Sequence, residues 1–183
     1  IRGATTIREQ LAKHRQIENI QSLLEKKGIP NSAKKRIDIL ELPLIRQTIN
    51  LLTYLDLESR KPHSGEHLLF EIMHYRFMGI DPRDAAKIAL HCGRNRLRWR
   101  EQLGRYDELK QLNLVQYPSV MFFEENLTQW IQSVANETLQ GLFERLLNWS
   151  GLLKQVLASD EKMQDLQVIT TFFDFLKSEC IKQ

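Results

Sequence analysis

Apolar residues recur at steps of three and four along most of this chain. In one clear run the repeating positions are Leu42, Ile45, Ile49, Leu52 and Leu55. Such steps keep side chains on one face of an α-helix, where they can pack against a core. The same spacing recurs in the segments 17–24, 127–134, 139–147 and 163–176. Alternating apolar and polar runs are nearly absent, so the pattern predicts an all-α fold, an irregular multi-helix domain.

Residues that start or stop helices divide this pattern into segments. Gly28, Ile29 and Pro30 end an early helix, because glycine suits the left-handed end of a helix and proline cannot continue it. Ser159 and Asp160 can cap the last helix. The capping pattern therefore predicts separate helices joined by short connections.

Three stretches depart from the helical pattern. Loops are expected at 62–65 and 93–104, which begin or end with glycine or proline. The stretch 112–123, LNLVQYPSVMFF, is rich in β-branched and aromatic residues, and we expect it to be extended and broken at Pro118.

Size and composition place the chain among globular domains. Its 183 residues are 42% hydrophobic and 27% charged, and no window approaches about 18 uncharged apolar residues. We therefore expect no membrane partner. Cys92 and Cys180 lack metal-type spacing, and free thiols in a reducing cytoplasm are the expectation for both.

The charge is divided unevenly along the chain. Residues 1–110 carry a net charge of +7 and residues 111–183 a net charge of −4. We expect one domain with a junction segment at 1–12, a basic half at 13–110 and an acidic helical half at 111–183. Such separation suggests that one end faces a polyanion, although an uneven solvated surface would give the same totals.

Motifs of common enzymes are missing, with one exception. No phosphate-binding loop, no G-x-S-x-G and no C-x-x-C occur. His63, Glu66 and His67 match H-x-x-E-H, which can hold a metal when both histidines share a helix face. Pro62 and the Ser64-Gly65 pair interrupt that helix, and Ser64 is better interpreted as a helix N-cap. A metal hydrolase stays as one alternative function.

Five arginines surround Trp99 in the segment 93–105, GRNRLRWREQLGR. Arginines around an aromatic ring suit phosphates or an exposed base. The alternative is a solvated segment with Trp99 in the core, and the same holds for the basic run 33–36.

The most specific pattern is YRFMGIDPRDAAK, residues 75–87. An apolar helix stops at Gly79, and Asp81-Pro82 starts another, the layout of a helix-hairpin-helix. Free backbone N–H groups near Gly79 and Ile80, at a helix start, can bind an anion. The predicted DNA-binding residues are Arg76, Gly79, Ile80, Arg83 and Lys87. An ordinary tight helix corner would have the same pattern.

The segment 14–58 resembles superfamily 1 helicases of the UvrD/Rep type at the entry to their 2B accessory subdomain. The matching features are Gly28-Ile29-Pro30, then Tyr54-Leu55, then RFMGIDPRD at the place of the family's R-G-I-G turn. The resemblance implies a 2B-like accessory subdomain that contacts the backbone of duplex or forked DNA, next to the motor domains of a parent helicase.

The sequence departs from that family in two places. Asp81 stands where the family often has glycine, and Arg83 is expected to compensate for this acid. Leu11 and Ala12 occupy the positions of the family's Tyr-Arg, whose arginine contacts the nucleotide. The chain alone is therefore expected to have no catalysis and no cofactor, with ATP and Mg belonging to the parent helicase. A helical protein-interaction or regulatory domain without DNA binding is the main alternative.

Overall fold

The computed structural model describes residues 23, 26–27 and 38–181, and the chain divides into two units, Ile1–Asp38 and Ile39–Gln183. The helices considered below all belong to the second unit. The predictions for Gly28-Ile29-Pro30, for the basic run 33–36 and for the junction 1–12 lie outside the described residues, as does most of the predicted helix 17–24.

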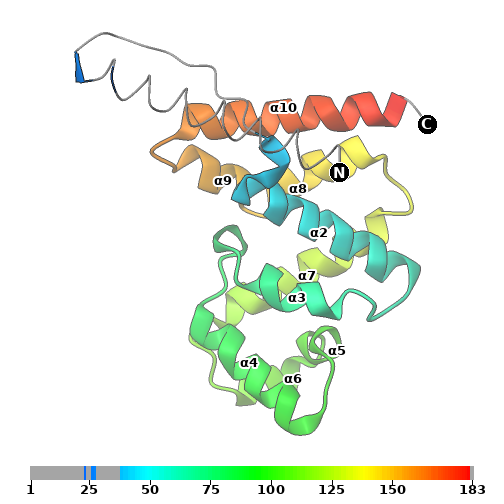
Figure 1. Ribbon diagram of the computed structural model, residues 1–183. Coiled ribbons are helices and arrows are strands. Elements are labelled where there is room, and N and C mark those ends of the chain that lie inside the picture. Colours follow the sequence, from blue (N-terminus) through cyan, green and yellow to red (C-terminus); the bar gives the residue numbers. More distant parts are fainter. Residues whose placement is uncertain (1–22, 24–25, 28–37, 182–183) are drawn as a thin grey trace, which may run out of the picture. The chain divides into compact units, whose positions relative to one another are not determined.

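Every regular element among the described residues is helical, which confirms the predicted all-α class (Figure 1). The elements are η1 (Ile39–Glu41), α2 (Pro43–Arg60), α3 (Glu66–Met73), η2 (Arg76–Met78), α4 (Pro82–Asn95), α5 (Trp99–Leu103), α6 (Tyr106–Gln111), α7 (Tyr117–Ser133), α8 (Leu139–Trp149), α9 (Leu152–Leu157) and α10 (Lys162–Ile181), where η denotes a 3-10 helix.

Helices α2 and α7 form the centre of the unit. They pack on each other, α3 lies against α2, and α7 also contacts α5, α6 and α8. The helices α4, α5 and α6 lie together at one end, and α8, α9 and α10 pack on one another at the other end (Figure 1). Helix α9 also contacts η2, so the segment that leads into α4 rests on the α8–α10 end.

The buried face of α2 is wider than the predicted stripe. Ile45 and Leu55 are fully buried as expected, but Ile49 and Leu52 are only half-buried. Tyr54 is fully buried instead. The reason is that α2 packs against both α3 and α7, and two neighbours cover more than one narrow stripe of a helix.

Two predicted non-helical stretches are wrong in part. Helix α7 begins at Tyr117, so the second half of 112–123 is helical, and Pro118 lies in the first turn, where its missing N–H costs no hydrogen bond. The predicted loop 93–104 is also largely helical, because α4 continues to Asn95 and α5 covers most of the rest. The predicted loop 62–65 is confirmed.

Neither of the two predicted serine caps occupies the N-cap position of its helix. The Ser159 hydroxyl accepts the backbone N–H of Glu161 at 3.1 Å, in the turn before α10, so the hydrogen bond stabilises that turn and does not cap the first turn of α10 as predicted. The prediction for Ser64 is wrong, because Gly65 is the N-cap of α3 and the Ser64 hydroxyl donates to the carbonyl of Leu57 at 2.7 Å.

Both cysteines are free thiols in the structure. Cys92 is buried on α4, and burial raises the pKa of its thiol to about 11. Such a thiol carries almost no thiolate at neutral pH and serves as a small apolar residue of the core.

Candidate nucleic-acid interface

The connection between α3 and α4 contains its own short helix. Helix α3 ends at Met73, Tyr75 is extended, and η2 follows before the chain reverses at Gly79. Asp81 then caps α4, with its side chain accepting the backbone N–H of Arg83 at 2.9 Å. The predicted Gly79 break and Asp81-Pro82 helix start are confirmed, but the connection is longer than a direct hairpin.

Gly79 is needed for its backbone conformation and leaves its surroundings open. Its φ of 68° lies in the left-handed region, which β-branched and bulky residues rarely adopt. A Cβ added there would meet nothing within 4 Å, so no protein atom covers this point. A ligand could therefore approach the backbone closely here.

The free N–H groups of the turn lie one residue later than predicted. The N–H of Gly79 donates to the carbonyl of Arg76 at 3.3 Å and is not free. Within the part of the chain that the structure describes, the N–H groups of Ile80 and Asp81 donate to no protein group. Two successive N–H groups without a protein partner therefore precede α4 and can donate to an anion, while the first turn of α4 offers fewer, because Pro82 has no N–H and that of Arg83 donates to Asp81.

Ile80 contributes only its backbone to this arrangement. Its side chain is 8% exposed and lies in the core with Phe77 and Met78. The other side of the turn rests on Gly151, which precedes α9. A Cβ on Gly151 would lie 2.3 Å from the carbonyl oxygen of Phe77, so η2 lies directly on the backbone there.

The prediction that Arg83 compensates for Asp81 by reaching phosphate is not what the geometry favours. The Arg83 guanidinium forms two bonds to the Asp81 carboxylate, from Nε at 3.0 Å and from Nη2 at 2.8 Å. Hydrogen bonds from Arg83 lower the pKa of Asp81 to about 2, so the pair stays ionised above about pH 4. The two charges cancel beside the turn.

The ion pair between Arg83 and Asp81 should weaken the binding of an anion at the turn, and a substitution can test this. Asn is a good N-cap, so Asp81→Asn keeps the cap of α4 while it removes the negative charge and releases Arg83. We expect duplex DNA affinity to rise by roughly fivefold at low salt, from the loss of one repulsive charge near a phosphate. Fluorescence anisotropy measures this, and weaker binding by the variant would contradict it.

The other two predicted cations, Lys87 and Arg76, differ in whether their charged groups already have a protein partner. Lys87 is half-buried, and its ammonium donates to the carbonyl of Asn113 in the α6–α7 connection. Arg76 is exposed and forms no ion pair with any described residue. Arg76 is therefore the most available cation beside the turn.

A cleft of about 960 Å³ lies next to the turn, lined by residues of η2, α2, α9 and α10. Arg76 and Lys154 line it, but so do the acids Asp160, Glu161 and Asp165. This mixed charge does not suit a polyanion. Gly79 also lines this cleft, whereas Ile80 and Asp81 do not, so the N–H groups of Ile80 and Asp81 are the better candidate contact.

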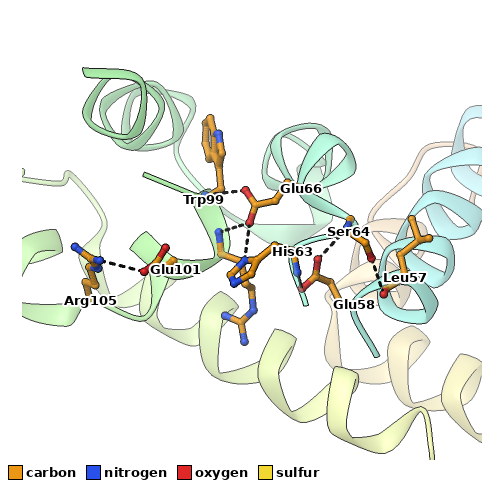
Figure 2. Close-up of polar contacts among 10 residues, drawn as sticks. Leu57, Glu58, His63, Ser64, Glu66, Trp99, Glu101 and Arg105 are labelled. Atoms are coloured by element: carbon orange, nitrogen blue, oxygen red, sulfur yellow. Dashed lines mark hydrogen bonds and ion pairs between the residues drawn. The ribbon is translucent and has the colours of Figure 1, made fainter. Parts of the chain in front are cut away.

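Carboxylates from distant positions fix the helices around the turn. Asp84 is fully buried and accepts the N–H groups of Val115 and Gln116, both at 2.7 Å, at the start of α7. Glu66 accepts the N–H groups of Trp99 and Arg100, at 2.8 and 3.0 Å, at the start of α5 (Figure 2). Glu66 satisfies two N–H groups that the start of α5 leaves free, and Asp84 holds the connection that leads into α7.

The H-x-x-E-H match has a structural role in this geometry. His63 lies outside α3 with a φ of 67°, and its Nδ1 is 3.4 Å from the Glu66 carboxylate, which already caps α5. His67 is exposed. No group of three or more metal-ligating side chains occurs among the described residues.

The five arginines of the segment 93–105 divide into two classes. Arg100 pairs with Glu124 at 2.9 Å, and Arg105 pairs with Glu101 and Glu108. Burial alone would raise the pKa of Glu124, but hydrogen bonds from Arg100, Tyr106 and Thr128 lower it. The other three are exposed and have no ion pair with any described residue: Arg94, Arg96 and Arg98.

Comparison with protein-family models, with curated proteins and with solved structures finds no match to this chain. The resemblance to the 2B subdomain therefore stays a prediction from the sequence. Across the described residues, no helix combines the length and the apolarity that crossing a bilayer requires.

Proposed function

We propose that this chain is a 2B-like accessory subdomain of an ATP-dependent DNA helicase, which binds the backbone of duplex or forked DNA without sequence preference. The observation that carries the proposal is the turn at Gly79. Its left-handed glycine is open to solvent, and two unpaired N–H groups follow it before α4. Contacts of this kind hold a phosphate but carry no base information.

The charges near the turn support weak binding. Arg76 is available, Lys87 adds a second positive charge on α4, and Arg83 is neutralised by Asp81. The proposal assigns no catalysis to this chain. ATP and Mg belong to the parent helicase, because the sequence lacks a phosphate-binding loop.

The test is the salt dependence of binding to two labelled duplexes of unrelated sequence. We expect equal affinities for both, with dissociation constants of roughly 10⁻⁴ to 10⁻⁶ M, and weaker binding as salt rises. Arg76→Ala should lower the salt slope by about 0.9, the loss of one phosphate contact.

Lys162→Gln is the matched control, because Lys162 is an exposed cation at the start of α10. The proposal predicts that this variant keeps the salt slope of the unsubstituted chain. Absence of binding at low salt, or an equal loss in Arg76→Ala and Lys162→Gln, would overturn the DNA contact at the turn.

A protein-interaction domain is the second candidate. Several large apolar side chains of the acidic half are exposed, namely Leu139, Trp149, Leu157, Met163, Phe175 and Ile181. A contiguous patch of such side chains would mark a contact site for a protein partner. This candidate predicts no salt-dependent binding to either duplex.

A further inference from the structure

A second surface combines aromatic rings with the unpaired arginines. Phe70 on α3 is 44% exposed, and its ring lies edge-on to the ring of Trp99, with centroids 5.2 Å apart. His74 is exposed and also contacts Phe70, with ring centroids 4.4 Å apart. These three rings form a partly exposed aromatic cluster.

The free arginines lie next to this cluster along the chain. Arg98 directly precedes Trp99 as the N-cap residue of α5, and Arg96 lies three residues before it. Both are exposed and form no ion pair with any described residue. Glu71, the residue after Phe70 on α3, is an exposed acid, and its carboxylate accepts a hydrogen bond from the Asn50 side-chain amide at 3.3 Å.

The backbone at Arg96 has an unusual conformation for its side chain. Arg96 is the C-cap of α4 with a φ of 55°, a left-handed position where glycine is the common residue. An L-residue other than glycine is less stable there, by roughly 1–2 kcal/mol. Glycine would therefore stabilise this helix end better than arginine does.

We propose that the Phe70–His74–Trp99 cluster, with Arg96 and Arg98, binds single-stranded DNA. Bases would stack on the exposed ring of Phe70, and the two guanidinium groups would contact successive phosphates. Rings beside unpaired cations suit an unstacked strand, because a duplex keeps its base faces covered. This contact is separate from the duplex contact at Gly79 and uses none of its residues.

The test is fluorescence anisotropy with a labelled 20-nucleotide oligo-dT at low salt. In the double variant Arg96→Gly/Arg98→Ser, glycine suits the left-handed position and serine suits the N-cap, so folding is preserved or improved. We expect roughly tenfold or greater loss of affinity and a salt slope lower by about 1.4, for two lost phosphate contacts on a single strand.

Phe70→Leu separates stacking from charge. Leucine keeps an apolar contact with Trp99 but offers no ring, so we expect a roughly fivefold or greater loss of oligo-dT affinity with an unchanged salt slope. Arg76→Ala is the control and should leave oligo-dT affinity unchanged while it weakens duplex binding. This outcome separates the two proposals.

Three results would overturn the single-strand site. The first is no binding of oligo-dT by the parent chain, and the second is parent-like binding by Arg96→Gly/Arg98→Ser or by Phe70→Leu. The third is clearly tighter binding of oligo-rU than of oligo-dT, which would assign the surface to RNA instead.

Discussion

Gly151→Ala is expected to lower the free energy of unfolding by about 3 kcal/mol or more. The residue has a φ of 90°, and an added Cβ would lie 2.3 Å from the carbonyl oxygen of Phe77. The clash is with backbone rather than with a flexible side chain, so η2 and α9 would have to separate. For a chain of this size the melting temperature should fall by about 6 to 12 °C.

Gly93→Ala is the matched control. Gly93 lies inside α4, and an added Cβ would meet nothing within 4 Å. Alanine at an open helix position should stabilise the fold by about 0.5–1 kcal/mol. If Gly151→Ala melts within about 1 °C of the parent chain, the close packing of η2 on α9 is wrong.

Asp84→Ala is expected to cost about 2–4 kcal/mol of unfolding free energy. The carboxylate is fully buried and accepts hydrogen bonds from the N–H groups of Val115 and Gln116. Alanine has no acceptor, so both N–H groups would lose their partner in the variant. Urea unfolding measures the loss. Amide hydrogen exchange should also show lost protection at Val115 and Gln116.

Asp84→Asn serves as the graded control for this prediction. Its side chain keeps one acceptor oxygen, so it can retain one of the two hydrogen bonds and should lose less stability than alanine. Parent-like unfolding of Asp84→Ala, with unchanged exchange at both amides, would contradict the structural role of this carboxylate.

Local signals in the sequence predicted the longer helices and the start of α4, but not the short helices α5, α6 and α9. Periodic apolar spacing identified α7, α8 and α10, and the Asp81-Pro82 pair correctly started α4. The apolar spacing and the helix-start signal both depend on residues a few positions apart, so they can be recognised in a single sequence. The Arg83–Asp81 pair is equally local, but its cancelling charges follow only from the bidentate geometry.

Long-range capping explains what the sequence could not predict. Glu66 caps α5 from more than 30 positions away, and Asp84, equally distant along the chain, holds the two residues just before α7. The β-branched residues of 112–123 favoured an extended stretch, yet Asp84 anchors a helix start there. No local sequence pattern predicts such distant partners. The same holds for the ion pair of Arg100 with Glu124, which distinguishes Arg100 from the unpaired Arg96.

The most direct test of the central claim is to follow the backbone amide signals of Ile80 and Asp81 by NMR while duplex DNA is added. Their N–H groups have no protein partner among the described residues, so a bound phosphate should shift both signals in a saturable, salt-sensitive manner. The amide of Gly79, which already donates to Arg76, should shift less. Unchanged signals at Ile80 and Asp81 under conditions where duplex binds elsewhere on the chain would contradict the account.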